Sequence, residues 1–393
     1  MAESTGPAEP PCGRLVAPMT PRAVDEHHRT ATPLELFFDL VFVVAVAQAS
    51  SGLHHAVADR DVADGVIGFA MAFFGLWWAW MNFTWFASAY DCDDVPYRLA
   101  VFVQMTGALI FAAGVPALAE GDLGVGVAGY VVMRLAAVAQ WLRAAASDPP
   151  RRATGRRYAL GIGLVQLGWI GLAFAPAAFV MPGFLTFLVV ELLIPAWAER
   201  VAPTTWHPHH IAERFGLMTI IVLGESILAA TVAIQSALRA GGAPADVGPV
   251  IVGGLLIVFS LWWLYFDRPV HDLLTTLRRA FVWGYGHYFV FASAAAVGAG
   301  LAIAVDQATG HADIGSRGAG LAVAIPVAVY LICLWVLHTR PRGERIRYLG
   351  PLTALLVLLA PLTEHAIPLT GLLLAALLAV QLAAGWRARP AAV

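Results

Sequence analysis

The stretch TPLELFFDLVFVVAVAQAS, residues 32–50, reads as the start of a membrane span, yet it carries two carboxylates, Glu35 and Asp39. On insertion scales, a charge at the centre of a bilayer costs about 2.5–3.5 kcal/mol. The two side chains therefore either lie at the water boundary or serve a purpose inside the membrane. They are four residues apart, which places them on one face of a helix.

The composition of the whole chain is that of an integral membrane protein. Of its 393 residues, 59% are hydrophobic and 13% are charged, against about 45–50% and about 25% in soluble domains. The net charge of −2 gives no basic surface, so we expect no nucleic-acid partner. The three cysteines, Cys12, Cys92 and Cys333, match no metal or disulfide framework. We therefore expect an all-α protein whose main partner is the lipid bilayer.

Twelve apolar stretches approach the roughly 20 residues that a membrane span needs. They are residues 34–52, 65–88, 98–119, 124–143, 157–177, 183–199, 214–236, 247–267, 280–304, 318–338, 348–362 and 367–386. The first 33 residues lack the apolar core of a signal peptide, which favours a cytoplasmic N-terminus.

The arginines support this arrangement, and the chain has no lysine. With the N-terminus inside, the cytoplasmic segments hold twenty arginines and the outer loops hold three, Arg60, Arg239 and Arg317. Such a bias follows the positive-inside rule. It predicts a multi-pass protein of the inner (plasma) membrane with both termini in the cytoplasm.

Four motifs recur in the same order in the two halves of the chain. ELFFDLVFVVAVAQAS from Glu35 aligns with ERFGLMTIIVLGESIL from Glu213, and WWAWMNF from Trp77 aligns with WWLYFD from Trp262. RYALG (157–161) aligns with RYLG (347–350), and the segment from Pro182 aligns with that from Pro368. Apolar segments also match by chance, so the polar and tryptophan matches are the ones that indicate a repeat.

The repeat predicts the organisation of the chain. Each half has six spans, an even number, so the halves are predicted to be parallel six-helix repeats. The predicted parts are a cytoplasmic N-terminal tail (1–33), a first repeat (34–199), a cytoplasmic linker (200–213), a second repeat (214–386) and a C-terminal tail (387–393).

Two specific motifs and two supporting ones resemble those of a known family. They are RTATPLELFFDLVFVVAVAQ (29–48), ERFGLMTIIVLGESILA (213–229), WWLYFD (262–267) and YGHYF (285–289). The chain resembles the low temperature requirement protein A (LtrA) family from about residue 29 to 386. The resemblance implies a bacterial multi-pass inner-membrane protein, named for a growth phenotype in the cold, and implies no established biochemical activity.

Five ionisable residues at membrane depth are candidates for an ion or substrate pathway. They are Asp39, Arg134, Glu191, Glu225 and His287. The guanidinium of Arg134 cannot shed its charge, so it needs a partner, and the three carboxylates are the candidates. A carboxylate in surplus over Arg134 could titrate or bind a cation. A buried pair can also be purely structural, so both roles stay open.

Other polar residues have simpler interpretations. Glu35 and Glu213 are expected to be helix-end carboxylates, which interact favourably with the helix dipole. His287 titrates near physiological pH, but on an aromatic helix it can equally be a hydrogen-bonded packing residue. The segment WHPHH (206–210) is expected to be a solvated linker.

Most of the thirteen tryptophans fall near predicted membrane interfaces, where an aromatic belt is expected. They include Trp77, Trp78, Trp197, Trp262, Trp263 and Trp386.

The leading functional hypothesis is a transporter or channel linked to protons or monovalent cations. The alternative is a membrane-embedded enzyme or scaffold factor acting on lipid or membrane assembly. The chain has no P-loop, GxSxG, HExxH or dinucleotide fingerprint. We therefore expect no catalytic residue, cofactor or metal site, and the sequence leaves a homo-oligomer open.

Overall fold

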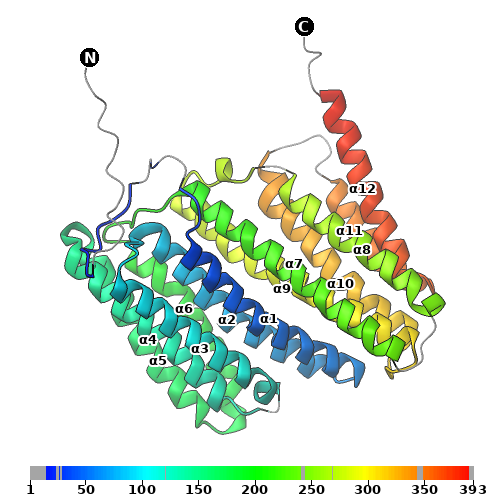
Figure 1. Cartoon of the computed structure of the whole chain (residues 1–393), viewed down its shortest axis with the longest axis horizontal. Helices are drawn as coiled ribbons and strands as arrows, with labels where there is room; N and C mark the ends of the chain where they lie inside the picture. Colours follow the sequence, from blue (N-terminus) through cyan, green and yellow to red (C-terminus); the bar gives the residue numbers. More distant parts are fainter. Residues whose placement is uncertain are drawn as a thin grey trace. The chain divides into compact units, whose positions relative to one another are not determined.

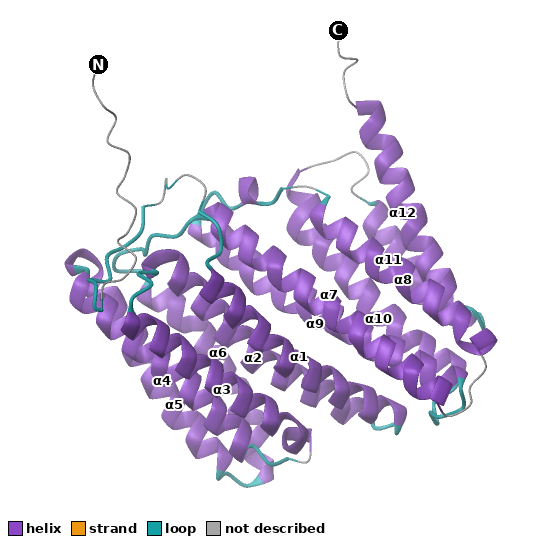
Figure 2. Cartoon of the chain, viewed as in Figure 1, coloured by secondary structure: helices purple, strands orange, loops and turns teal. Residues whose placement is uncertain are grey.

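The computed structural model describes residues 15–23, 26, 29–119, 121–239, 244–267, 269–342 and 348–388. Within these ranges the chain is helical and has no strand (Figures 1 and 2). The predicted all-α class is therefore confirmed for the described part of the chain. Residues 1–14, 24–25, 27–28 and 389–393 of the predicted tails lie outside it, as do Cys12 and Arg347.

Twelve α-helices form from the described residues. They are α1 (Pro33–Ala58), α2 (Val62–Tyr90), α3 (Val95–Ala119), α4 (Gly124–Ser147), α5 (Arg152–Ala173), α6 (Ala177–Ala198), α7 (Pro208–Arg239), α8 (Pro244–Phe266), α9 (Leu277–Ala308), α10 (Ser316–Leu334), α11 (Leu349–Leu359) and α12 (Ala366–Ala388). Each overlaps one of the twelve predicted stretches.

Ten of these helices are long and apolar enough to cross a membrane. Of the other two, α5 starts with three arginines within its first six residues, and α11 has 11 residues before a 3₁₀ turn that contains Pro361. The helices thus fit a multi-pass membrane protein, and the predicted number of twelve spans stays a prediction.

A capping box starts helix α1. The carboxylate of Glu35 accepts a hydrogen bond from the Thr32 backbone N–H at 2.7 Å, and the Thr32 hydroxyl accepts one from the Glu35 N–H at 3.3 Å. Pro33 occupies the first helical position, where its missing N–H costs nothing. Glu35 therefore lies in the first turn of α1 and closes its cap.

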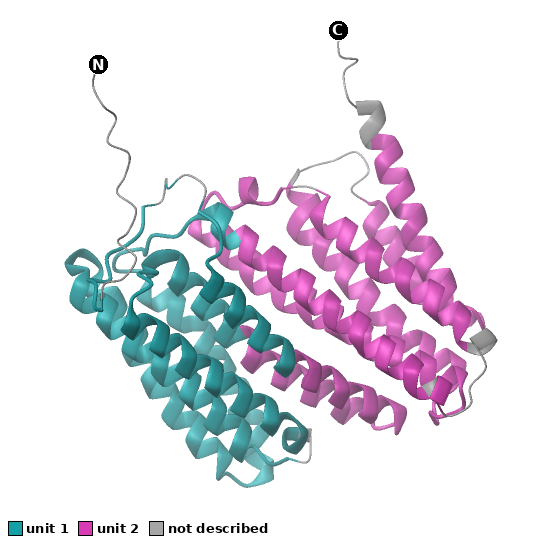
Figure 3. Cartoon of the chain, in the orientation of Figure 1, with its two compact units in different colours: residues 1–45, 78–211 teal, residues 46–77, 212–393 magenta. Residues whose placement is uncertain are grey.

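The chain divides into two compact units, coloured separately in Figure 3. Unit 1 comprises residues 1–45 and 78–211, and unit 2 comprises residues 46–77 and 212–393. Helices α1, α2 and α7 contribute residues to both units. The two predicted repeats rest on sequence similarity and stay a prediction.

In unit 1, helices α3 to α6 pack in sequence order, each against the next. Glycines bring the backbones of α3 and α4 together. A Cβ atom on Gly129 would lie 2.3 Å from the Phe111 nitrogen and 2.6 Å from the Gly107 oxygen. Close approach through small residues is a main source of helix association in membranes, where burial of apolar surface gives no driving force.

In unit 2, α9 is the most buried of the ten membrane-length helices. It packs on α10 and α8, and α8 packs on α12. A Cβ on Gly298 of α9 would lie 2.7 Å from the Ser226 Cα of α7, and one on Gly253 of α8 would lie 2.7 Å from the Pro368 nitrogen of α12. Small residues therefore fix these helix contacts as well.

The contact between α3 and α4 gives a prediction about stability. Gly129→Ala should destabilise the protein by about 1–3 kcal/mol, because the added methyl group has to displace backbone atoms of α3. Gly163→Ala on α5 is the matched control, since a Cβ there meets nothing within 4 Å. Thermal unfolding in detergent measures both, and equal melting temperatures for the two variants would contradict the close packing.

Candidate functional site

A buried ion pair joins α4 and α6 in unit 1. The Nη2 atom of Arg134 lies 2.8 Å from Oε2 of Glu191, and the two side chains are 2% and 0% exposed. Arg134 pairs with no other carboxylate in the described ranges. The prediction that Arg134 meets one of the candidate carboxylates is therefore confirmed, and the partner is Glu191.

Four neutral groups also donate hydrogen bonds to Glu191. They are Trp78 Nε1 at 2.9 Å, Tyr130 Oη at 2.9 Å, Gln166 Nε2 at 3.3 Å and Trp169 Nε1 at 3.3 Å. Together with Arg134 they replace the water that the carboxylate would have outside the protein. These donors were not predicted, because a single Gln or Trp in an apolar helix gives no sign of its partner.

Asp39 is the second carboxylate of unit 1 at membrane depth. It is fully buried, and its Oδ1 accepts a hydrogen bond from Trp80 Nε1 at 2.7 Å. The adjacent Phe38 packs on Phe83, with ring centroids 4.0 Å apart. Asp39 therefore faces protein, as its cost in lipid led us to expect.

The tryptophans of α2 correct the prediction of a general aromatic belt. Trp77 and Trp78 are 2% and 0% exposed, so they lie in the protein interior. Trp262, Trp263 and Trp197 are exposed to 46%, 44% and 38%, as a belt requires. Some tryptophans thus lie in the interior and others on the surface, and the sequence alone does not distinguish the two positions.

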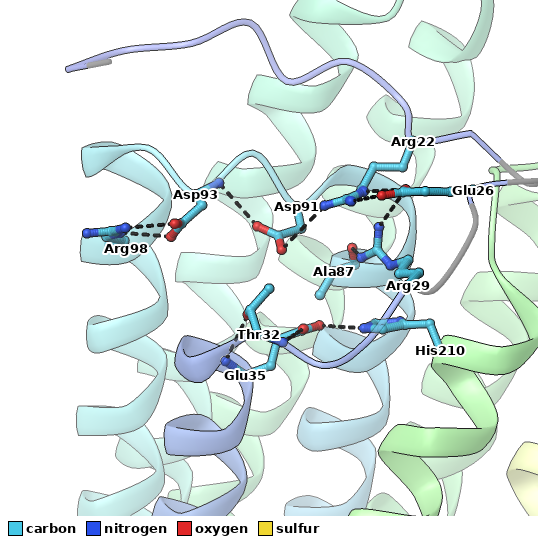
Figure 4. Close-up of polar contacts among 10 residues, drawn as sticks. All are labelled: Arg22, Glu26, Arg29, Thr32, Glu35, Ala87, Asp91, Asp93, Arg98 and His210. Carbon is cyan, nitrogen blue, oxygen red and sulfur yellow. Dashed lines mark hydrogen bonds and ion pairs between the residues drawn. The ribbon is translucent and has the colours of Figure 1, made fainter. Parts of the chain in front are cut away.

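Glu35 extends from the capping box to a second partner, His210, whose Nε2 lies 3.0 Å from Oε1 of Glu35 (Figure 4). Both side chains are at most 1% exposed. His207 is 7% exposed, and its backbone N–H donates to Ser88 Oγ at 3.0 Å. The expectation of a solvated WHPHH linker is therefore wrong for His207 and His210, which are buried, whereas His209 is exposed.

Beside Glu35, the N-terminal segment brings further charges against the end of α2 (Figure 4). Arg22 pairs with Glu26 and lies 3.9 Å from Asp91. Arg29 donates to the Ala87 carbonyl oxygen at 2.7 Å and is 5% exposed. We call Arg22, Glu26, Arg29, Glu35, Asp91 and His210 the α1-end cluster.

The α1-end cluster holds one carboxyl with a raised pKa. Burial, followed by the nearby charge of Glu35, raises the pKa of Asp91 from 3.8 to about 6. In contrast, the hydrogen bond from Arg22 lowers the pKa of Glu26. Burial lowers the pKa of Arg29. Burial thus disfavours the charged forms of Asp91 and Arg29.

Glu225 is the candidate carboxylate of unit 2. It is the eighteenth of the 32 residues of α7, and it is 7% exposed. Its Oε2 atom is buried and has no hydrogen-bond partner in the described part of the chain. The next residue, Ser226, donates to the Ala294 carbonyl oxygen of α9 at 2.8 Å. Glu225 is thus held in the interior without the donors that surround Glu191.

His287 lies in the aromatic interior of unit 2 and is fully buried. Its Nδ1 is 2.7 Å from the Trp283 carbonyl oxygen, and its Nε2 is 3.0 Å from the Tyr265 hydroxyl. A carbonyl only accepts, so Nδ1 donates and Nε2 can accept from Tyr265. This is the geometry of the hydrogen-bonded packing residue that the sequence left open.

Two charged residues of α7, Glu213 and Arg214, lie elsewhere than the sequence predicted. Because this helix begins at Pro208, Glu213 lies in its second turn with a half-buried side chain, instead of at the helix end. Arg214, which the sequence placed in a cytoplasmic segment, is fully buried. In the described ranges, no group of three or more His, Cys, Asp or Glu residues could hold a metal ion.

The ion pair of unit 1 gives a prediction about stability. Arg134→Ala should destabilise the protein by about 3–5 kcal/mol, because it leaves the charge of Glu191 buried without its cation. Adding Glu191→Gln to Arg134→Ala should recover part of this loss. Arg98→Ala, which removes an exposed pair with Asp93, should cost at most about 1 kcal/mol. Unfolding in detergent measures all three, and equal losses for Arg134→Ala and Arg98→Ala would refute the buried pair.

Asp91 gives a prediction about pH. Its raised pKa means that the folded state binds more protons than the unfolded state, so stability falls as pH rises from 3.8 to about 6. Asp91→Asn should remove this loss and stabilise the protein by about 1–3 kcal/mol above pH 6, with little effect near pH 4. Asp93→Asn, which removes the charge of an exposed carboxylate near Asp91, is the control. Melting temperatures across this range would contradict the assignment if Asp91→Asn and the unaltered protein kept the same pH dependence.

Two comparisons with known proteins show what this chain is similar to. A curated protein of Rhizobium meliloti (strain 1021), described as uncharacterized protein RA0937, is 28% identical over 274 residues, and the match covers 64% of this chain and 64% of that protein. The family described as Bacterial low temperature requirement A protein (LtrA) matches residues 30–385. The chain therefore belongs to the LtrA family.

Proposed function

We propose that this LtrA protein is a membrane transporter or channel in which Glu225 binds a proton or a monovalent cation. The observation that carries the proposal is the buried Oε2 atom of Glu225, which has no hydrogen-bond partner among the described residues. A buried carboxylate without partners is strongly unfavourable as an anion. Uptake of a proton or a cation removes this cost, and ionisable groups inside a membrane commonly mark such pathways.

The contrast with Glu191 supports the choice of Glu225. Glu191 has Arg134 and four neutral donors around it, so its charge is already compensated by protein. Arg134 pairs with Glu191, so Asp39 and Glu225 are both in surplus, and of these two Glu225 is the one with a buried oxygen that has no partner among the described residues. Asp39, which accepts a hydrogen bond from Trp80, and His287, which bonds at both ring nitrogens, already have partners within their own units.

The proposal includes the topology inferred from the sequence. In this topology, two parallel six-helix repeats lie in the inner membrane and both termini lie in the cytoplasm. The excess of arginines in the inner segments supports it. Exposed leucines on α5, at Leu160, Leu164 and Leu167, support a lipid-facing position for that helix as well.

A cavity in unit 2 favours the second candidate function, a membrane-embedded enzyme or scaffold factor that acts on lipid. It measures about 110 Å³ and lies between α7, α8 and α9. Apart from Ser226 and Thr231, its lining is apolar, including Ile234, Leu255 and Leu301. Such a cavity suits part of an acyl chain.

Flux measurements in liposomes test the proposed function. Glu225→Gln should leave the purified protein folded while pH-dependent flux of protons or potassium ions falls towards that of protein-free liposomes, because Gln keeps the shape of the side chain but cannot titrate. Glu364→Gln is the matched control in unit 2, since Glu364 is exposed.

The outcomes distinguish the candidates. Normal flux with Glu225→Gln would refute a role for this carboxyl. If the unaltered protein conducts no ion, and lipid copurifies in fixed proportion with it, the lipid-acting alternative replaces the transporter.

A further inference from the structure

A second cavity, in unit 1, lies between α2, α3 and α4. It has about 10 Å³ of space for the centre of a water-sized particle, which is room for about one such particle. Its polar lining residues are Asn82, Gln104, Arg134 and Gln140, and its aromatic ones are Phe83, Phe86 and Trp141. The cavity therefore borders Arg134 in unit 1 and has no part in the function proposed for Glu225 in unit 2.

Two buried side chains of this lining have N–H groups without partners. Arg134 uses Nη2 for Glu191, but its Nε and Nη1 atoms have no hydrogen-bond partner. Gln140 accepts from Gln104 Nε2 through its Oε1 at 2.7 Å, but its own Nε2 has no partner. Arg134 is 1% exposed and Gln140 is 3% exposed.

The unpartnered buried atoms of the described lining are thus all donors. A water molecule would accept from them but would also have to donate its two hydrogens. An anion only accepts, and it can take the N–H groups of the guanidinium that Glu191 leaves unused. The aromatic remainder of the lining excludes a large hydrated ion.

We infer that this cavity is a binding site for a small monovalent anion of the size of chloride. The anion accepts hydrogen bonds from Arg134 and Gln140, while Glu191 keeps its bond to Nη2 of the guanidinium. Chloride is only slightly larger in radius than water, so it suits a cavity for one such particle. The site differs from Glu225 in position and in the sign of the ion, and it does not depend on the proposed transport.

Bromide is the probe for this site, because it resembles chloride and can be located by its anomalous scattering. Purified protein in a chloride-free gluconate buffer should gain thermal stability saturably as sodium bromide replaces sodium gluconate, since a ligand of the folded state stabilises it. Crystals grown in bromide should show one anomalous peak within hydrogen-bond distance of Arg134 and Gln140. This crystallographic experiment uses the unaltered protein, so it tests the site even if a variant fails to fold.

Two variants test the residues. Gln140→Leu should weaken the apparent bromide affinity by about tenfold or more, as expected for the loss of a hydrogen bond to a charged group. Gln166→Leu is the matched control, because Gln166 is equally buried and bonds Glu191 but does not line the cavity.

Three results would overturn the inference. They are a linear or absent response to bromide, an equal loss of affinity in the two variants, and a water in the cavity that bromide does not replace.

Discussion

The buried carboxylate of Glu191 is the constraint on which unit 1 depends. It receives Trp78 from α2, Tyr130 and Arg134 from α4, and Gln166 and Trp169 from α5, while it is itself part of α6. One charge thus ties four helices together. In lipid the helices gain little from burying apolar surface against each other, so such polar contacts and small residues decide their register. Removing the carboxylate would leave Arg134 without its carboxylate partner and would take one acceptor from each of the four neutral donors.

The carboxylates of Glu191 and Glu225 differ in how many hydrogen-bond donors they have. Glu191 is saturated with donors, whereas Glu225 has an oxygen without a partner in the described ranges. Arg134 also has two nitrogens that the ion pair leaves unused. A group that is buried and satisfied stabilises structure, and one that is buried and unsatisfied is suited to an exchangeable ion. On this ground we propose a structural role for Glu191, and ion binding at Glu225 and in the cavity beside Arg134.

The two carboxylates at the start of α1 have separate explanations. Glu35 closes a capping box with Thr32 and pairs with His210, and Asp39 accepts a hydrogen bond from Trp80 one turn further on. Neither lies in open water, since both are at most 1% exposed. The charges of this stretch are therefore tolerated because aromatic N–H, imidazole and backbone groups surround them. The pKa of Asp91, near Glu35, is raised because burial and the charge of Glu35 outweigh the charges of Arg29 and Arg22.

By itself, the sequence determined the helical class, the approximate limits of the helices, the family and the need of Arg134 for a carboxylate. These follow from local hydropathy, from motifs and from the fixed charge of a guanidinium, none of which requires knowledge of distant contacts. Only the tertiary structure decided that the partner is Glu191 and not Glu225, that Trp78 bonds a carboxylate while Trp262 is exposed, and that His210 is buried. Each of these depends on which helix faces which. In a chain whose helices are apolar on every side, that choice is made by a few polar contacts between residues far apart in sequence.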